Sequence, residues 1–432
     1  MIAVIGLGFV GLTTAVGLAE KTGRKVRGYD LDARKVAAIR GGELPFYEEG
    51  LGDALKRHIG GTFVVEDDLG EVIRESEVVF FCVGTPCGED GQADLGILKS
   101  AIDSCLRYVD GYKTLVIKST VPPSTSERVL KPLLESRGLV VGDSIGLASN
   151  PEFLREGTCW QDFTEPDRVV IGCFDRKDEQ RLKDVYAPFG APVECVSPTT
   201  AEFIKYLSNT LLATMISYSN ELSMIADAIG GIDVKTAFEV LHKDRRWLPD
   251  GGGSPSGGGA GGGVLAPVAM SAYVYPGSGF GGYCLPKDTS ALAAISESSG
   301  CDPLVLRAAL ETNRRIKLHI AAKVEKLAPD TSTPIGILGL SFKPNSDDVR
   351  DTPAKHLIEQ LLADGYTDIV AYDPIATDVF KSHYGLPIRY ADTLDEVLES
   401  CDTLALVTAW DEFKGLKDKA PTKRIVDGRY VL

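Results

Sequence analysis

Short apolar runs bounded by glycine, proline or acidic residues recur near both ends of the chain, with stretches of helical spacing between them. Uninterrupted apolar runs are typical of strands that are buried on both faces of a parallel sheet. Ile2–Ile5 is such a run, and the other predicted strands are Lys25–Tyr29, Glu77–Val83, Thr114–Lys118, Ile335–Phe342, Asp368–Tyr372 and Thr403–Val407. This pattern predicts an α/β fold with two Rossmann-like domains, each built on a parallel sheet.

The middle of the chain lacks this strand pattern. From about Thr199 to Ala228 apolar residues recur at helical spacing, over a length that suits the spine of a helical domain or a dimer interface. A long connecting helix is predicted at Pro303–Leu327, and a loop at 250–263, where glycine dominates. The predicted domains are 1–197, a helical central domain at 198–310, and 311–432.

Glycines follow the first predicted strand at the spacing of a dinucleotide-binding fingerprint. Gly6 would allow a tight turn, Gly8 the close approach of a pyrophosphate, and Gly11 the packing of the next helix on the strand. The second strand ends at Asp30, which can accept hydrogen bonds from both ribose hydroxyls and favours NAD over NADP. This order of elements predicts an NAD site.

A glycine-rich run at residues 277–288, GSGFGGYCLPKD, ends in chemically active side chains. Its glycines leave room for a ligand or another backbone. A positive charge such as Lys287 beside a thiol favours the nucleophilic thiolate. If the segment turns helical, Asp288 shares a face with Cys284. A buried structural cysteine is the alternative, but this setting favours Cys284 as a catalytic nucleophile.

Two threonines follow predicted strands at the edge where parallel sheets bind ligands. Thr85 comes after Glu77–Val83, and Thr120 comes after Thr114–Lys118. Their hydroxyls could therefore reach the nicotinamide half of the cofactor or the substrate. Helix capping or turn chemistry explains either threonine alone equally well.

Two further pairs of polar residues are spaced four apart. On a helical turn Glu152 and Glu156 would place two carboxylates side by side, which suits a general acid or base, although spacing alone favours a solvated face. Lys205 and Asn209 would offer an ammonium and an amide to one developing oxyanion. A helix lysine is more often simply solvated.

The composition is that of a soluble globular protein, with 432 residues of which 44% are hydrophobic and 25% charged. A formal net charge of -15 argues against nucleic acid and against a membrane surface as partners. The nine cysteines lack disulfide-framework or zinc spacing and the five histidines are scattered, so no metal is expected. The apolar N-terminus carries glycines and no basic segment, which favours a cytoplasmic protein over a secreted one.

Seven motifs, in order, resemble those of the UDP-glucose/GDP-mannose dehydrogenase family over nearly the whole chain. They are GLGFVGL, VGTP, KSTVPP, NPEFLREG, AEFIKYLSNT, GFGGYCLPKD and SFKPNSDDVRDTP. The resemblance implies an enzyme that uses NAD twice to oxidise the C6 alcohol of a nucleotide sugar to a carboxylate. It also implies a homodimer or a higher homo-oligomer. UDP-glucose is the expected substrate, with TDP-glucose and GDP-mannose as alternatives.

The resemblance also implies roles for single residues. Cys284 would attack the C6 aldehyde to give a thiohemiacetal and later a thioester, which water hydrolyses. The other catalytic positions match Lys205 and Asn209 as oxyanion stabilisers, Asp288 and Thr120 at the water, Glu156 as acid or base, and Glu152 in support. The cofactor positions match Gly6, Gly8, Phe9, Val10, Gly11, Asp30, Lys35, Thr85, Lys287 and Arg350. The substrate positions match Phe153, Leu154, Arg155, Lys205, Asn209, Arg246, Tyr273, Gly281 and Lys343.

The chain departs from the family's pattern between Asp244 and the cysteine run, where about 25 extra residues suggest an inserted loop. In the family an arginine near this point reaches the partner subunit's substrate; Arg246 fits its spacing and Arg245 is the alternative. Two other hypotheses are a two-electron NAD dehydrogenase with a structural Cys284, and a sensor that binds NAD and a nucleotide without turnover. Neither explains why Cys284 and Asp288 accompany the Lys205 and Asn209 pair.

Overall fold

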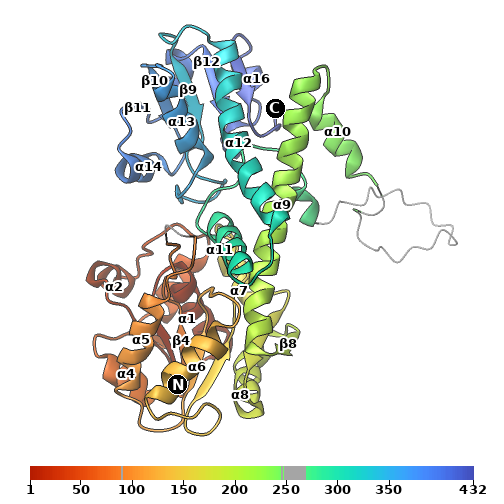
Figure 1. Ribbon diagram of the computed structural model, residues 1–432. Helices are drawn as coiled ribbons and strands as arrows, with labels where there is room; N and C mark the ends of the chain where they lie inside the picture. Colours follow the sequence, from red (N-terminus) through yellow and green to blue (C-terminus); the bar gives the residue numbers. More distant parts are fainter. Residues whose placement is uncertain (89–90, 245–246, 248–268) are drawn as a thin grey trace, which may run out of the picture. The chain divides into compact units, whose positions relative to one another are not determined.

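The computed structural model describes residues 1–88, 91–244, 247 and 269–432, which pack into two compact units (Figure 1). The N-terminal unit comprises Met1–Ser208 and Ser290–Asp302, and the C-terminal unit comprises Asn209–Thr289 and Pro303–Leu432. The predicted loop at 250–263 and both candidate arginines, Arg245 and Arg246, lie outside the described residues. The predicted three-domain division remains a prediction.

The N-terminal unit is built on an eight-stranded sheet in the order β3-β2-β1-β4-β5-β6-β7-β8. All neighbouring strands are parallel except β6 and β7, which are antiparallel. The strands are β1 (Ile2–Ile5), β2 (Val26–Tyr29), β3 (Phe63–Val65), β4 (Val78–Phe81), β5 (Thr114–Ile117), β6 (Gly146–Ser149), β7 (Val169–Cys173) and β8 (Val193–Val196). The four strands predicted in this part of the chain are confirmed.

Helices cover both faces of this sheet, which explains why the central strands β1 and β4 are uninterrupted apolar runs. Ile2 and Val4 of β1 lie in a core with α1, α2, α3, α7 and α8, whereas Ala3 and Ile5 lie in a second core with α4, α5 and α6. The helices are α1 (Phe9–Thr22), α2 (Ala33–Arg40), α3 (Leu51–His58), α4 (Leu69–Glu75), α5 (Gly96–Leu106), α6 (Lys131–Ser136), α7 (Cys159–Thr164) and α8 (Arg176–Tyr186).

The C-terminal unit contains a five-stranded sheet, wholly parallel, in the order β11-β10-β9-β12-β13. The strands are β9 (Ile335–Leu338), β10 (Ile369–Tyr372), β11 (Arg389–Tyr390), β12 (Thr403–Leu406) and β13 (Arg424–Asp427). Strand β9 is shorter than the predicted Ile335–Phe342. It ends because Gly339 turns the chain with φ of +92° and the Leu340 and Ser341 N–H groups donate to Asp373 Oδ2, at 2.8 and 3.0 Å.

Helices again cover both faces of this second sheet. One core packs α12, α13 and α14 against it, and another packs α15 and α16 on the opposite face. These helices are α12 (Leu304–Leu327), α13 (Pro353–Ala363), α14 (Thr377–Tyr384), α15 (Leu394–Ser400) and α16 (Leu416–Lys419), whereas α10 (Val234–Leu241) packs in a separate apolar cluster with Ala226 and Val274. Helix α12 confirms the connecting helix predicted at Pro303–Leu327.

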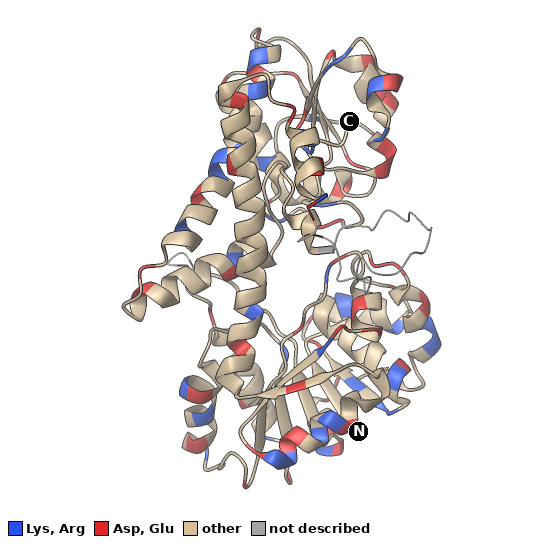
Figure 2. Cartoon of the chain, turned by 90° about the vertical axis from the view of Figure 1, so that its right-hand side faces the viewer, with Lys and Arg blue, Asp and Glu red and all other residues tan. Residues whose placement is uncertain are grey.

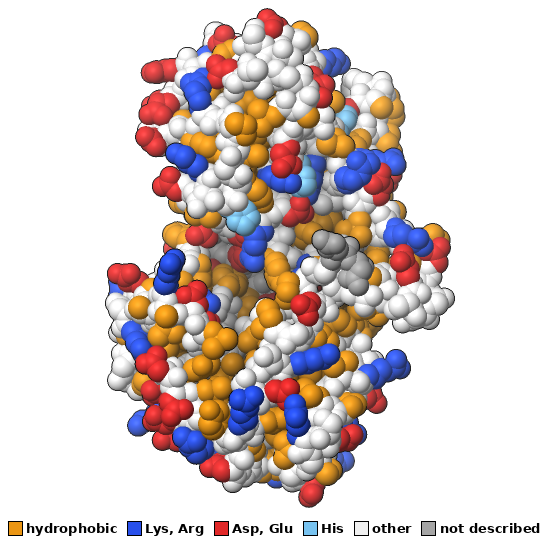
Figure 3. All heavy atoms as spheres, turned by 60° about the vertical axis from the view of Figure 1, so that its left-hand side comes forward, with side chains coloured by type: hydrophobic (Ala, Val, Ile, Leu, Met, Phe, Trp, Pro, Cys, Tyr) orange, Lys and Arg blue, Asp and Glu red, His pale blue; other side chains and the backbone are white. Residues whose placement is uncertain are grey.

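Two helices contribute residues to both units. Helix α9 (Pro198–Ile229) confirms the long helix predicted from about Thr199 to Ala228, and α11 (Cys284–Ser298) begins at the candidate nucleophile. Among the described residues, no helix combines the length and apolar character needed to cross a membrane. On the face shown in Figure 3, basic and acidic side chains are interspersed.

Candidate active site

The glycine fingerprint forms the turn between β1 and α1. Gly6 has φ of +88°, and a Cβ there would lie 2.9 Å from the Cys82 carbonyl oxygen. A Cβ on Gly11 would lie 1.7 Å from the Gly6 carbonyl oxygen, so only glycine lets the helix approach this closely. A Cβ on Gly8 would have no atom within 4 Å. The space beside Gly8, at the N-terminus of α1, therefore suits an anionic group.

Asp30 lies beside this turn, just after β2. Its Oδ2 accepts hydrogen bonds from the Leu7 N–H at 2.7 Å and from Lys35 Nζ at 2.9 Å, and its Oδ1 accepts from the Asp32 N–H at 2.9 Å. Burial alone would raise the pKa of Asp30, but these donors hold it below its usual range. The side chain is thus a fixed carboxylate.

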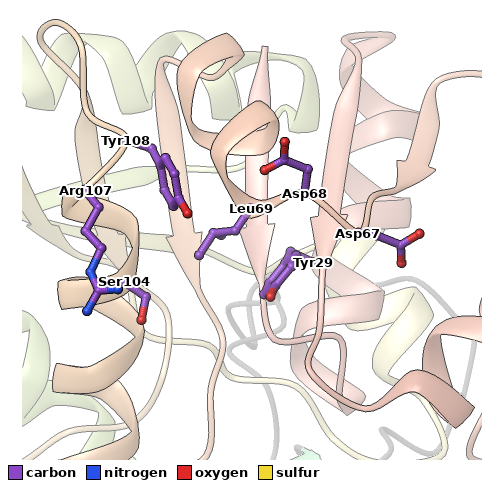
Figure 4. A pocket seen from close by; sticks show the side chains of 7 residues that line it. All are labelled: Tyr29, Asp67, Asp68, Leu69, Ser104, Arg107 and Tyr108. Carbon is purple, nitrogen blue, oxygen red and sulfur yellow. The ribbon is translucent and has the colours of Figure 1, made fainter.

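Two adjoining cavities open beside this carboxylate. The smaller, about 250 Å³, is lined by Asp30 and by Leu31, whose side chain is 88% exposed. The larger, about 530 Å³, is shown in Figure 4, with Tyr29 and Leu69 at its centre and Asp67 and Asp68 on one side. Ser104, Arg107 and Tyr108 line the other side. An exposed leucine next to a fixed carboxylate suits the adenine and ribose of a dinucleotide.

Thr85 and Thr120 lie at the carboxyl edge of the same sheet, after β4 and β5. The Thr85 hydroxyl donates to the Thr120 carbonyl oxygen at 2.7 Å, and the Thr85 side chain is buried. This bond ties the two loops together. The Thr120 side chain is partly exposed, and the ligand roles of both threonines remain predictions.

A buried ion pair joins Glu152 to Lys205 of α9. Lys205 Nζ lies 2.9 Å from Glu152 Oε1, with the two side chains 4% and 8% exposed, and the Leu154 N–H donates to Glu152 Oε2 at 2.6 Å. Burial alone would raise the pKa of Glu152, but the Lys205 charge and these hydrogen bonds hold it below its usual range. Lys205 Nζ also lies 5.6 Å from the centre of the Phe153 ring.

The predicted helical turn that would align Glu152 with Glu156 is wrong. The backbone from Pro151 to Arg155 is not helical. Proline restricts the backbone at the start of this segment, and Glu152 is bonded to Lys205 while Arg155 pairs with Asp162 at 2.6 Å. Glu152 and Glu156 therefore do not share a helix face, and Glu152 has a buried partner of its own in Lys205.

A second buried carboxylate secures the loop that follows Thr120. Glu202, one turn before Lys205 on α9, accepts a hydrogen bond from the Ser126 N–H at 2.8 Å and is 2% exposed. Burial raises the pKa of Glu202 to about 7. Sequence reasoning missed this residue, because one acid in a long helix gives no signal of what it faces.

The glycine run before Cys284 is held against neighbouring backbone in the C-terminal unit. A Cβ on Gly281 would lie 2.4 Å from the Asp351 carbonyl oxygen, so this glycine is required by close packing. The Gly282 N–H donates to the Arg350 carbonyl oxygen at 2.8 Å. Cys284 is exposed and is the first residue of α11, a position where helix N–H groups favour a thiolate.

Asp288 lies one turn into α11, as the sequence predicts. Its Oδ2 accepts a hydrogen bond from Asn209 Nδ2 of α9 at 2.6 Å, and its Oδ1 pairs with Lys287 Nζ. All three side chains are buried, with Asp288 only 1% exposed. Lys205 and Asn209 stand four residues apart on α9, so they face the same side of that helix.

The remaining predicted cations stack on aromatic rings beside this run. The Arg350 guanidinium lies 4.7 Å and Lys287 Nζ 5.4 Å from the centre of the Tyr283 ring, and Lys343 Nζ lies 5.5 Å from that of Phe342. Tyr273 ends the short helix Ala269–Tyr273. In the N-terminal unit, the Phe9 ring packs on Phe46, with centres 5.2 Å apart, and Val10 follows Phe9 in α1.

Three family models match the chain, and all describe one family. The NAD binding domain matches residues 1–190, the central domain residues 199–315, and the UDP binding domain residues 336–432. The chain belongs to the UDP-glucose/GDP-mannose dehydrogenase family. It is an NAD-dependent oxidoreductase, and the family resemblance seen in its motifs is confirmed.

Similar proteins match this dehydrogenase along nearly its full length. It is 33% identical to UDP-glucose 6-dehydrogenase AglM of Haloferax volcanii over 100% of this chain and 97% of that protein. It is 35% identical to UDP-glucose 6-dehydrogenase TuaD of Bacillus subtilis, over 99% and 88% of the two chains. The solved UDP-glucose dehydrogenase of Pyrobaculum islandicum has a TM-score of 0.87 at 33% identity, over 100% of this chain and 94% of that one. The predicted fold class is confirmed.

The geometry of the fingerprint in this dehydrogenase fits NAD. When NAD binds, the open space at Gly8 would hold the pyrophosphate, Asp30 would accept from the adenosine ribose, and the exposed Leu31 would lie beside the adenine. Asp30 is already bonded to Lys35 and to two backbone N–H groups. A ribose must therefore bind to the lone pairs that these donors leave on the carboxylate.

Gly8→Ala and Gly11→Ala form a matched pair of substitutions with opposite expected effects. Gly8 has an ordinary φ of -72° and open space, so its alanine variant should keep its stability within about 0.5 kcal/mol and bind NAD roughly tenfold more weakly. Gly11→Ala meets backbone and should lose about 2 kcal/mol or more of stability. Calorimetric NAD binding and urea unfolding measure the two effects. Equal stabilities of the two variants would contradict this account.

Glu202→Gln should flatten the pH dependence of stability. The pKa of Glu202 is near 4.5 in an unfolded chain and about 7 in the folded one, so the carboxyl group stabilises the fold when protonated. That contribution is lost as pH rises from about 4.5 to about 7. Urea unfolding of both proteins across this range should show a shallower decline for the variant. Parallel pH profiles would refute the assignment.

A further cation of the C-terminal unit was missed by sequence reasoning. A Cβ placed on Gly277 would lie 2.7 Å from an Arg429 guanidinium nitrogen, so this arginine lies directly against the glycine run. Burial lowers the pKa of Arg429. The available signal was its place just after β13 (Arg424–Asp427), where parallel sheets bind ligands.

Proposed function

We propose that this dehydrogenase oxidises the C6 alcohol of UDP-glucose to a carboxylate, with two NAD+ and one water consumed per sugar. The observation that carries the proposal is the exposed Cys284 at the start of α11, one turn from a buried Asp288 that Asn209 and Lys287 hold. A dehydrogenase that stops at the aldehyde needs no nucleophile at this place. Two relatives named UDP-glucose 6-dehydrogenase, at 33% and 35% identity, support the choice of sugar.

The ammonium group of Lys205 is proposed to stabilise the negative charge that develops on the C6 oxygen during the first oxidation. NAD, when bound, supplies a hydride acceptor for each of the two oxidations. As the C6 hydroxyl loses its proton and C6 loses a hydride, negative charge collects on the oxygen, and an ammonium beside it stabilises that charge. Glu152 fixes the position of Lys205 through their 2.9 Å contact. Glu156 is the proposed acid or base at this step, and Thr120 is proposed to act with Asp288 at the water that hydrolyses the later thioester.

Cys284 serves the second oxidation. Its thiolate attacks the C6 aldehyde, a C–S bond forms, and the resulting oxyanion is stabilised by Lys205 and Asn209. Loss of a second hydride from C6 turns this thiohemiacetal into a thioester. Asp288 then takes a proton from water, the hydroxide attacks the thioester carbonyl, and the C–S bond breaks to return the thiolate. The products are the uronate and free Cys284.

Basic side chains around the glycine run suit the phosphates of a nucleotide sugar. Lys343 and Arg429 are proposed to bind the substrate diphosphate, and Arg350 and Lys287 to face the cofactor. The loop of Phe153, Leu154 and Arg155, with Gly281 and Tyr273, is proposed to hold the sugar and the base. Arg246, which lies outside the described residues, remains the proposed contact to a partner subunit's substrate.

A panel of nucleotide sugars tests the substrate. NADH formation is followed with UDP-glucose, TDP-glucose, GDP-mannose and UDP-N-acetylglucosamine, and kcat/KM is compared. The highest kcat/KM is expected with UDP-glucose. A higher value with another sugar would keep the chemistry and replace the substrate, and NADH formation with none of them would favour a sensor that binds without turnover.

We also propose a homodimer that buries an apolar stripe on α9. The stripe consists of exposed apolar side chains, namely Phe203, Leu207, Leu211, Tyr218, Ile225 and Ile229. Helix α9, the long helix of Figure 2, has no charged residue between Lys205 and Glu221. Its stripe could therefore pack against the same stripe of a second copy of the chain. Leu211→Glu with Ile225→Glu should give a monomer in sedimentation equilibrium, whereas Val140→Glu, at another exposed position, should not.

A cytoplasmic location is proposed as well. The nine cysteines lack the spacing of a disulfide framework, which suits a reducing compartment. Cell fractionation with activity measurements tests this, and activity found outside the cytoplasm would refute it.

A further inference from the structure

Three charged side chains meet behind the glycine run of the C-terminal unit. Lys317 Nζ of α12 lies 3.2 and 3.1 Å from the two carboxylate oxygens of Asp351, and His356 Nε2 of α13 lies 2.6 Å from Asp351 Oδ1. Lys317 is 5% exposed. Burial alone would raise the pKa of Asp351, but His356 and Lys317 hold it below its usual range. No role in the reaction proposed above uses these three residues.

Backbone contacts connect this cluster to the segment 277–283 that precedes Cys284, called here the Cys284 loop. Asp351 presents its carbonyl oxygen to Gly281, where an added Cβ would lie only 2.4 Å away. The residue before it, Arg350, accepts the Gly282 N–H at 2.8 Å. Any movement of Asp351 must therefore move the two glycines that lie just before Tyr283 and Cys284.

Helix α12, which carries Lys317, also hydrogen-bonds to the Cys284 loop directly. Asn313, one turn before Lys317 on α12, accepts a hydrogen bond from the Phe280 N–H at 2.7 Å and donates to the Phe280 carbonyl oxygen at 3.0 Å. Helix α12 thus holds the loop at two points, through Asn313 at Phe280 and through Lys317 and Asp351 at Gly281.

The backbone of Asp351 indicates that its carboxylate matters for this support. Its φ is +46°, in the left-handed region where a residue other than glycine costs about 1 kcal/mol or more. Glycine would remove that cost, yet would also remove the group that Lys317 and His356 bind. Strain of this kind persists where the surroundings fix a conformation that function requires.

We propose that Lys317, Asp351 and His356 are positioning residues that set the geometry of the Cys284 loop for thiolate attack. They do so by fixing the Asp351 carbonyl oxygen against Gly281. The proposal rests on the proposed role of Cys284 as nucleophile. Because no contact with NAD or with the sugar is proposed for these three residues, their loss should lower kcat more than it raises the KM for NAD.

Asp351→Asn is the first test, since asparagine tolerates the left-handed region and removes only the charge. Lys317→Met removes the other partner at nearly constant length. Lys323→Met is the matched control, because Lys323 lies six residues further along α12 and pairs at 2.9 Å with Asp227 instead of with Asp351. Asp351→Gly, which relieves the strain, serves if the asparagine variant fails to fold.

Alkylation of single cysteines by iodoacetamide gives a readout that does not depend on turnover. The rate at Cys284 is measured by peptide mass spectrometry beside those at Cys87 and Cys301, which are also exposed. In Asp351→Asn and Lys317→Met the Cys284 rate should fall roughly threefold or more, because the thiol leaves the N-terminus of α11, and kcat should fall roughly tenfold. The other two cysteines and the control variant should react as in the wild type.

Two outcomes would overturn the proposal. One is a Cys284 alkylation rate and a kcat equal to those of Lys323→Met. The other is a parallel change at all three cysteines, which would report general loosening of the fold. If the wild-type protein turned over no nucleotide sugar, the proposed function would fail. The alkylation rates of Cys284 would still show whether Lys317 and Asp351 position the loop.

Discussion

Cys284→Ala should lose uronate formation by about a thousandfold or more, because it removes the thiol proposed to form the thioester. NAD affinity should stay within about twofold, since the fingerprint and Asp30 lie in the N-terminal unit and Cys284 in the other. Nucleotide-sugar products are separated by chromatography and the acid is quantified, with NAD binding measured by calorimetry.

Cys301→Ala is the control for this substitution. Cys301 is also an exposed thiol, but it lies outside the glycine run and the proposed chemistry. Its variant should form the acid at the wild-type rate. Continued uronate production by Cys284→Ala would show that Cys284 is not the nucleophile and has only a structural role.

Lys205→Met should lose both activity and stability. It removes the cation proposed to stabilise the oxyanion and leaves the buried Glu152 without its partner. Breaking a buried ion pair from one side costs about 3–5 kcal/mol. In the wild type the pKa of Glu152 is held below its usual range, so its contribution to stability is present above the unfolded-state value near 4.5 and lost as pH falls.

The double variant Glu152→Gln with Lys205→Met separates the two effects. It removes the stranded charge, so most of the lost stability should return, while kcat stays low because the cation is still missing. Urea unfolding and steady-state kinetics on the three proteins give both quantities. A double variant with wild-type kcat would show that Lys205 serves only the fold.

Strands β1, β2, β4 and β5 of the first sheet were predictable, and β1 and β2 end directly before a glycine and an acid. Strands β3, β6, β7 and β8 were not predicted. Glu194 and Cys195 interrupt the apolar pattern of β8, and no local signal shows that β7 runs antiparallel to β6. Strand β9 was drawn too long, since apolar residues continue past Gly339 although the chain has already turned.

Sequence predicts best those parts of the site that lie on one element. The face shared by Cys284 and Asp288 on α11 follows from helix geometry alone. Contacts between distant segments leave no local trace, and the pairing of Lys205 with Glu152 is an example. The mistaken helical turn at Glu152 arose for the same reason, because spacing cannot show that a buried lysine already holds one carboxylate.

The number of NADH molecules released per UDP-glucose consumed tests the central claim most directly. The reaction is run to completion with limiting sugar and excess NAD, and free aldehyde is trapped in a parallel sample. Two NADH per sugar with no free aldehyde is the predicted result, because the aldehyde passes directly to Cys284. One NADH per sugar, with the aldehyde recovered, would contradict the thioester route.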